Sequence, residues 1–134
     1  MIKGAKLMNY TKDNIGDFRS LIVYQKSAIY VKKIYEIVNN LPAIEKYNIA
    51  DQMRRAVSSV TANIAEGYAR ISYKEEYSFL NISVGSISEV RSFLDLCLMM
   101  GYISEEDYKL LDKDAEEILK MLIGKMQSIR RITG

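Results

Sequence analysis

The sequence predicts an all-α protein, an antiparallel up-down four-helix bundle that is oligomeric. Three observations favour this fold class. Apolar residues recur at alternating spacings of three and four over long segments, which is the period of a helix that buries one face. Pro42 is the only proline among 134 residues, so few positions interrupt a helix. The segments between the periodic runs are short, and short connections join antiparallel neighbours.

The chain divides into an N-terminal arm and one helical domain. Residues 1–16 contain glycines, asparagines and three lysines without a sustained apolar period. We therefore expect residues 1–16 to form a flexible basic N-terminal arm and residues 17–134 to form the four-helix bundle. A chain of this length buries about two-thirds of its unfolded surface, which is enough for one core.

The first helix is expected from about Phe18 to Asn40. It ends near Pro42, because the residue before a proline is disfavoured in the helical conformation. Apolar residues at strict three-four spacing predict its buried seam. These residues are Leu21, Tyr24, Ala28, Val31, Tyr35 and Val38.

The first helix carries more apolar residues than one buried seam explains. Those beside the seam would face solvent in an isolated bundle, and contiguous exposed apolar surface usually marks an interface. We therefore expect this side of the helix to mediate self-association. The candidate interface residues are Ile22, Val23, Ile29, Tyr30 and Ile37.

The second helix is expected to begin between Asn48 and Asp51 and to end at about Gly67–Ala69, where the glycine suits a helix end. Serine, threonine and asparagine surround its apolar stripe, although these residues lower helix propensity. This composition indicates that the polar groups are enclosed and specifically paired, or that the backbone closely approaches a neighbour. The apolar stripe comprises Met53, Val57, Val60 and Ile64.

Serine caps open the last two helices. Ser72, with Glu75 three residues later, starts the third helix, which continues to Met100 and stops at Gly101. It carries two adjacent apolar stripes, so it either is the most buried helix or exposes a second face. Ser104 and three acidic residues start the fourth helix, because acids favour the positive end of the helix dipole. The seam of the fourth helix comprises Tyr108, Leu111, Ala115, Ile118, Leu122 and Ile129, widened by Leu119 and Met126.

Basic residues follow one side of the first helix. The whole chain carries a net charge of only +2, so its total charge does not indicate nucleic-acid binding. Cations that recur every seven residues lie on one side of a helix, where they can contact successive phosphates of a nucleic-acid backbone. An oligomer would repeat this row of cations in each subunit. The alternative interpretation is a solvated helix face. The candidate nucleic-acid residues are Arg19, Lys26, Lys32 and Lys33.

The second helix also carries charges in pairs. Arg54 and Arg55 point about 100° apart, and Glu66 precedes Arg70 by four residues, the spacing of a helical ion pair. Structural ion pairing is the preferred interpretation, with phosphate or RNA contact as the alternative. Asn63 is expected to bond across to another helix, because a buried amide must be satisfied.

Arg91 interrupts the apolar seam of the third helix. Either the buried stripe rotates at this point, or Arg91 pairs with an acid such as Glu66 or Glu89. The sequence leaves both possibilities open.

The sequence lacks the residue types on which most catalysis depends. It has no histidine, the commonest general base and metal ligand, and no phosphate-binding glycine loop. We therefore expect no enzymatic activity, no cofactor and no metal. Cys97, the only cysteine, is flanked by apolar residues and is expected in the core of a cytoplasmic protein. Neither a membrane span nor a signal peptide is apparent.

An ordered series of motifs runs from Phe18 to Ile103. These motifs are Phe18-Arg19-Ser20-Leu21, Leu41-Pro42 with Glu45 and Tyr47, Gln52-Met53-Arg54-Arg55-Ala56, Ser58, Asn63-Ile64-Ala65-Glu66-Gly67, and Gly85-Ser86 with Glu89. Through them the chain resembles the bacterial four-helix-bundle family encoded in intervening sequences of 23S rRNA genes, often labelled S23 ribosomal protein. This family is related to the accessory variability proteins of diversity-generating retroelements. It usually has tryptophan where Tyr24 stands and phenylalanine where Leu41 stands.

The resemblance implies an antiparallel four-helix bundle that assembles into a ring, typically a homopentamer. Most members of the family have no established biochemical role, and the ribosomal label reflects gene location. The retroelement branch binds a reverse transcriptase and nucleic acid through a strongly basic pentamer, whereas this chain is nearly neutral. The signature positions, expected to organise bundle and ring, are Arg54, Arg55, Asn63, Glu66 and Arg70.

We therefore expect a non-enzymatic homopentamer that binds RNA or a ribonucleoprotein through the basic stripe of the first helix. The alternative is a ring-shaped protein–protein adaptor without direct nucleic-acid binding.

Overall fold

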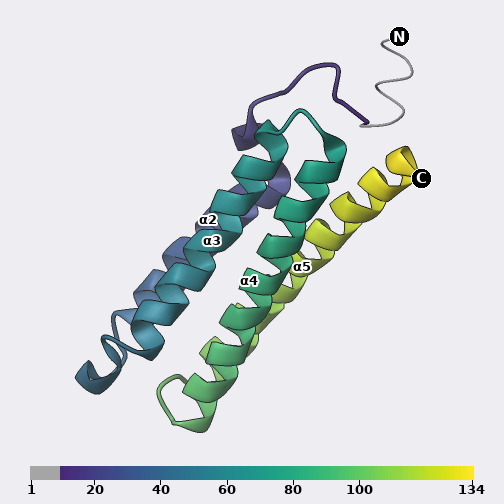
Figure 1. Cartoon of the computed structure of the whole chain (residues 1–134). Coiled ribbons are helices and arrows are strands. Elements are labelled where there is room, and N and C mark those ends of the chain that lie inside the picture. The colour runs from purple at the N-terminus through teal and green to yellow at the C-terminus, as the bar shows by residue number, and fades with distance from the viewer. Residues whose placement is uncertain (1–9) are drawn as a thin grey trace.

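The protein is an all-α bundle in the computed structural model, which describes residues 10–134 (Figure 1). Its four long helices are α2 (Ile22–Val38), α3 (Ile49–Ala69), α4 (Tyr73–Met99) and α5 (Glu105–Thr133). Two short 3-10 helices, η1 (Phe18–Ser20) and η2 (Ala43–Glu45), precede α2 and α3. The chain reverses direction at each connection between the long helices (Figure 1).

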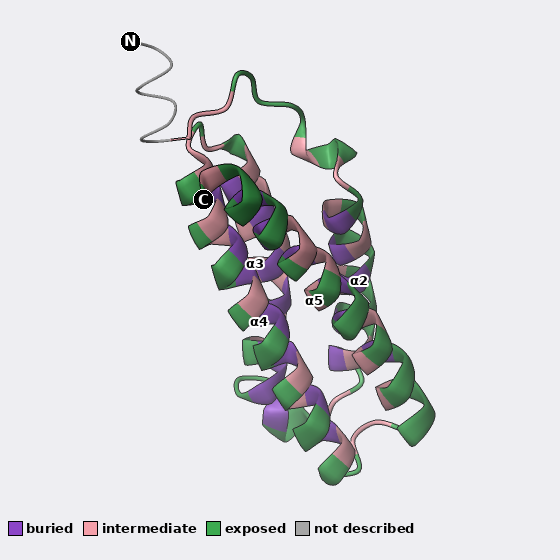
Figure 2. Ribbon diagram, turned by 90° about the vertical axis from the view of Figure 1, so that its right-hand side faces the viewer, coloured by how far each residue is buried: buried purple, intermediate pink, exposed green. Residues whose placement is uncertain are grey.

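The four helices surround one core. Contacts join α2 to α3, α3 to α4, α4 to α5 and α5 back to α2, so α2 and α4 lie diagonally across the bundle. The buried residues of every helix face the space between the four helices (Figure 2). The predicted stripe of α3 is confirmed, and so is that of α5 except that Tyr108 and Leu119 are only half-buried. On α3 the predicted residues Met53, Val57, Val60 and Ile64 are all buried. On α5 the buried residues are Leu111, Ala115, Ile118, Leu122, Met126 and Ile129.

The predicted seam of α2 is largely wrong: of its six residues only Val38 is fully buried, and Tyr24 and Val31 are half-buried against the core. The buried face instead comprises Val23, Ser27, Tyr30, Ile34 and Val38. Leu21 lies before the helix in an extended conformation, and Ala28 and Tyr35 are exposed. Apolar residues cover more than half of the α2 circumference, so spacing alone allowed more than one rotation. The true stripe also contains a serine, which a count of apolar residues passes over.

The predicted caps of α4 and α5 are confirmed. The Ser72 side chain accepts a hydrogen bond from the backbone of Glu75, and the Ser104 side chain accepts one from the backbone of Asp107. Gly101 lies just after the end of α4 and has a φ of +74°, a left-handed conformation that glycine adopts without strain. The buried face of α4 draws on both predicted stripes, including Leu80, Val90 and Cys97.

Residues 10–12 pack against the bundle, whereas residues 13–16 are exposed, so the predicted flexible arm over residues 1–16 is anchored at residues 10–12. The Lys12 backbone donates to the carbonyl of Ile71, and the backbone of Tyr73 donates to the carbonyl of Tyr10. Thr11 and Ser72 form an isolated antiparallel bridge. The remainder of the predicted arm, residues 1–9, lies outside the described residues.

A buried ion pair holds this segment in place. Lys12 Nζ lies 2.9 Å from Glu76 Oε1, and the two side chains are only 4% and 2% exposed. Lys12 Nζ also donates to the carbonyl of Tyr68 at 2.9 Å, and Lys125 Nζ lies 3.6 Å from Glu76 Oε2. Sequence reasoning missed this cluster, although Glu76 falls four residues before Leu80 on the buried face of α4. None of the helices over residues 10–134 combines the length and apolarity needed to cross a membrane.

The buried ion pair generates a prediction about stability. Lys12→Met should lower the free energy of unfolding by roughly 3–5 kcal/mol, because it leaves Glu76 charged in the core with only the more distant Lys125. The double variant Lys12→Met/Glu76→Leu should recover most of this loss, since it removes both charges. Urea unfolding followed by circular dichroism measures both.

Arg19→Met is the matched control, because it removes an exposed ion pair with Asp17. Its cost should stay below about 1 kcal/mol. An equal loss in Arg19→Met and Lys12→Met would contradict a structural role for the buried pair.

Candidate functional site

Helices α3 and α4 approach each other closely through small polar residues. Ser83 Oγ donates to the carbonyl of Val60, and Ser86 Oγ donates to Ser59 Oγ, each at 2.9 Å. A Cβ on Gly67 would stand 2.8 Å from the Cβ of Phe79, closer than side-chain atoms pack. Both explanations offered for the composition of α3 are therefore present, because its polar groups are paired and its backbone approaches a neighbour.

The signature residues of α3 form ion pairs on its surface. The predicted pair between Glu66 and Arg70 is confirmed. Arg70 also lies over the ring of Phe79, 4.9 Å from its centre, and so links the end of α3 to α4. Arg55 pairs with Asp51 one turn earlier at 2.9 Å. These contacts favour a structural role for Arg55, Glu66 and Arg70.

The prediction that Asn63 bonds to another helix is wrong. Its amide nitrogen donates to the backbone carbonyl of Ser59 at 2.8 Å and to the Ser59 hydroxyl at 2.9 Å, both within α3. The half-buried amide finds acceptors in the preceding turn, and the Ser59 hydroxyl makes the contact with α4 instead. Asn63 therefore positions the serine that joins the two helices.

Arg54 differs from the other signature residues. Its guanidinium donates only to the backbone carbonyl of Lys46, at 3.4 Å. No carboxylate within residues 10–134 pairs with it. The predicted structural ion pair of Arg54 is therefore absent from the described part of the chain.

The predicted basic stripe lies beside α5 rather than opposite the core. Lys26 pairs with Glu117 at 2.7 Å and Lys33 pairs with Asp114 at 2.8 Å, and both acids belong to α5. The hydrogen bond between Lys26 and Glu117 raises the pKa of the lysine and lowers the pKa of the acid, so both groups stay charged. Arg19 pairs with Asp17 on the segment before α2.

Lys32 is the remaining member of the stripe. It is exposed, and among the described residues no carboxylate pairs with it. The structure thus places Lys26, Lys32 and Lys33 on α2 and Arg19 in η1 before it, and acids neutralise three of the four.

Two of the five candidate interface residues lie in the core. Val23 and Tyr30 are only 5% and 2% exposed, which corrects the prediction that they face solvent. Tyr30 Oη donates to the carbonyl of Leu111 at 2.9 Å, and burial raises the pKa of this phenol. Ile37 is half-buried, whereas Ile22 and Ile29 are 70% and 60% exposed.

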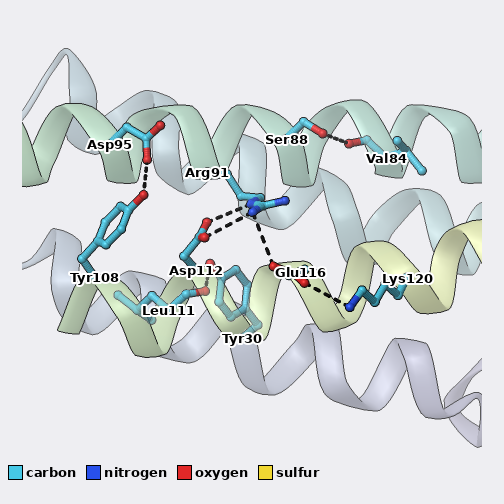
Figure 3. A network of polar contacts seen from close by, with 10 residues as sticks. All are labelled: Tyr30, Val84, Ser88, Arg91, Asp95, Tyr108, Leu111, Asp112, Glu116 and Lys120. Atoms are coloured by element: carbon cyan, nitrogen blue, oxygen red, sulfur yellow. Dashed lines mark hydrogen bonds and ion pairs between the residues drawn. The ribbon is translucent and has the colours of Figure 1, made fainter. Parts of the chain in front are cut away.

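Arg91 joins α4 to α5 through a polar network (Figure 3). Its Nε and Nη2 donate to the two carboxylate oxygens of Asp112 at 2.8 and 3.2 Å, a bidentate arrangement. Glu116 lies 3.9 Å from the same guanidinium. The partners are therefore acids of α5 rather than Glu66 or Glu89.

A second hydrogen bond in the network joins the same helices, from Tyr108 Oη to Asp95 (Figure 3). An open pocket of about 320 Å³ lies at the network, lined by Ser88, Arg91, Ser92, Asp95, Tyr108 and Asp112. The hydrogen bond to Asp95 raises the pKa of Tyr108, and the hydrogen bond to Asp112 raises the pKa of Arg91. Both groups therefore retain their protons at neutral pH, which favours a clamp between helices over acid–base chemistry.

The described residues offer little else for chemistry. No group of three or more Cys, Asp or Glu side chains within residues 10–134 is arranged to hold a metal ion. Cys97 is buried, as predicted, with its Sγ 3.9 Å from Met53 Sδ, and burial raises the pKa of its thiol. A thiol in this environment is a packing residue.

The Arg91 clamp generates a second prediction. Asp112→Ala should lower the free energy of unfolding by about 1–2 kcal/mol, because it leaves a partly buried guanidinium with only the distant Glu116. Thermal and urea unfolding measure the change. The exposed pair of Glu105 and Lys109 supplies the control, since Glu105→Ala should cost less than about 0.5 kcal/mol. Equal losses in the two variants would contradict the clamp.

Comparison with known proteins assigns the family. The chain matches the model of the 23S rRNA-intervening sequence protein family over residues 19–124. It is also similar to the crystal structure of a protein of unknown function from Bacteroides thetaiotaomicron, assigned to the S23 ribosomal protein family. The TM-score is 0.74 at 28% sequence identity, covering 79% of this chain and 96% of that one. No curated protein matches the chain. With the family pattern spanning most of the bundle, this chain belongs to the 23S rRNA-intervening sequence protein family.

Proposed function

We propose that this protein is a non-enzymatic subunit of a cytoplasmic homo-oligomeric ring, a pentamer by its resemblance to the family, that acts as a protein–protein adaptor. The observation that supports this proposal is a pair of apolar surfaces on opposite sides of one subunit. The similar crystal structure is of a protein of unknown function, so the proposed assembly and role of this chain rest on its own surfaces.

The first apolar surface lies on α2. Ile22 and Ile29 are exposed and stand one heptad apart, so they share a face of the helix. Each precedes by four residues a lysine that pairs with α5, namely Lys26 and Lys33. The surface therefore lies on the α5 side of α2.

The second apolar surface lies on α4. Ile82 and Leu96 are 49% and 41% exposed and stand two heptads apart. Ser86, four residues after Ile82, bonds to α3, which places this surface on the α3 side of α4. Phe79 and Phe93 add half-buried rings to the same side of the helix.

The diagonal positions of α2 and α4 turn these two surfaces away from each other. A subunit with two different self-association surfaces on opposite sides makes heterologous contacts, and these close into a ring when the rotation between neighbours allows it. A dimer with two-fold symmetry would need only one self-complementary surface. The two-sided arrangement therefore supports a ring.

RNA or ribonucleoprotein binding through Arg19, Lys26, Lys32 and Lys33 is the second candidate function. The observation that favours it is the exposed, unpaired Lys32 within residues 10–134, which a ring would repeat once per subunit. Glu117 and Asp114 neutralise Lys26 and Lys33, however, so each subunit offers little net positive charge along α2. The pairing of these lysines therefore favours the adaptor function over nucleic-acid binding through α2.

Assembly is tested by disrupting each surface separately. Ile22→Asp/Ile29→Asp and Ile82→Asp/Leu96→Asp should each convert the oligomer into a folded monomer, because each removes one half of every heterologous contact. Light scattering coupled to size-exclusion chromatography measures the mass. Ile71→Asp is the control, because Ile71 is 59% exposed in the α3–α4 connection and lies outside both surfaces.

A mixing experiment sharpens the assembly test. Each double variant keeps the surface that the other has lost, so an equimolar mixture should form a one-to-one dimer that cannot close into a ring. Retention of the full mass by either double variant alone would place the contact elsewhere. A mixture that stays monomeric would contradict heterologous pairing of these two surfaces.

The second candidate makes its own prediction. If the α2 stripe binds RNA, Lys32→Glu should weaken binding several-fold and reduce the slope of log affinity against log salt by about one. Fluorescence anisotropy with a structured RNA at several salt concentrations measures both quantities. Lys74→Glu, an exposed change at the start of α4, is the control. Unchanged affinity in Lys32→Glu would remove α2 as the contact.

A further inference from the structure

The connection between α2 and α3 forms a small pocket whose charged lining residues are both cationic. The pocket has a volume of about 220 Å³, and Lys46 and Arg54 line it beside the apolar residues Val38, Leu41 and Pro42. No carboxylate is among its lining residues. A positively charged recess with an apolar floor suits an anionic group.

The environment of Arg54 differs from that of its neighbours in the bundle. Arg19, Arg55, Arg70 and Arg91 each pair with a carboxylate. Arg54 is half-buried yet contacts only the carbonyl of Lys46 at 3.4 Å, so its planar donors remain available. A guanidinium with free donors is well matched to a phosphate, which it binds through two parallel hydrogen bonds.

An exposed aromatic ring follows the pocket residue Lys46 in the chain. Tyr47 is 84% exposed, although a tyrosine ring on a small bundle usually packs against a neighbour. Lys46 Nζ lies 5.4 Å from the centre of the ring, so a cation already occupies the vicinity of its π system. A ring with an open face next to cations is the combination with which proteins bind single-stranded nucleic acid.

Hydrogen bonds to Glu45 hold the α2–α3 connection, which carries Lys46 and Tyr47, against the rest of the bundle. Tyr102 Oη donates to Glu45 Oε2 at 2.8 Å, and Asn48 Nδ2 donates to Glu45 Oε1 at 3.3 Å. Glu45 is only 8% exposed and thereby ties the α2–α3 connection to the α4–α5 connection. The α2–α3 connection is therefore held in place, which reduces the entropy cost of binding at the pocket.

We propose that this end of the bundle is a binding site for single-stranded nucleic acid. Arg54 and Lys46 hold a backbone phosphate in the pocket, and Tyr47 stacks on an adjacent base. The site goes beyond the proposed adaptor function and does not depend on ring assembly. It also differs from the α2 stripe, because it lies at the α2–α3 connection and combines its cations with a pocket.

The experiment measures binding of fluorescein-labelled single-stranded oligonucleotides, an RNA and a DNA of the same sequence, by fluorescence anisotropy. Tyr47→Ser should weaken binding about tenfold, because it removes the stacked base. Arg54→Gln should weaken binding at least several-fold and reduce the slope of log affinity against log salt by about 0.7, the value for one phosphate of a single strand. Inorganic phosphate should compete only at far higher concentrations than the oligonucleotides.

Arg55→Gln is the matched control, because this adjacent arginine already pairs with Asp51 and points away from Arg54. Equal losses in Arg55→Gln and Arg54→Gln, or unchanged affinity in Tyr47→Ser, would overturn the proposal. Competition by inorganic phosphate as effective as that by the oligonucleotides would overturn it too, leaving a simple anion site. Preference for the RNA or the DNA arm would support the site and identify its nucleic acid.

Light scattering on each variant separates this inference from the proposed adaptor function. Tyr47→Ser and Arg54→Gln should retain the oligomeric mass of the wild type, because both residues lie outside the two apolar surfaces. Loss of mass together with loss of binding would overturn the site as an independent feature. Loss of binding at constant mass would support it.

Discussion

The close contact between α3 and α4 is the constraint on which the other features depend. Gly67 leaves no side chain between the two helices, and Ser83 and Ser86 of α4 donate hydrogen bonds to a backbone carbonyl and a serine hydroxyl of α3. Because a helix turns as a rigid rod, directing Ser83 and Ser86 toward α3 also directs Arg91 toward α5. The same rotation buries Glu76, where it receives Lys12. A wider separation of α3 and α4 would displace both of these ion pairs.

Local signals made much of the fold predictable. The caps at Ser72 and Ser104 and the stripes of α3 and α5 could be identified because one apolar face in each segment was unambiguous. Helix α2 carries apolar residues on several faces, and its buried stripe includes Ser27. Its rotation follows from contacts with α3 and α5, which the local sequence does not contain.

The candidate site shows the same division between local and long-range information. The pair of Glu66 and Arg70 spans one helical turn and could be predicted from spacing. The partner of Arg91 lies on a different helix, and so do the acids that neutralise Lys26 and Lys33. A periodic run of lysines therefore looked like free charge in the sequence, although the fold supplies counter-ions for two of them. The proximity of Lys46, Tyr47 and Arg54 likewise depends on how the α2–α3 connection folds.

The ion pair of Lys12 and Glu76 also constrains the order in which the protein can be completed. During synthesis Lys12 leaves the ribosome well before Glu76, and Lys125 follows only at the end of the chain. The N-terminal segment must therefore remain hydrated until α4 has formed, and Glu76 acquires its second cationic neighbour, Lys125, only when α5 has docked. Closure of this cluster is thus a late event that reports completion of the bundle, and it joins the beginning of the described chain to its final helix.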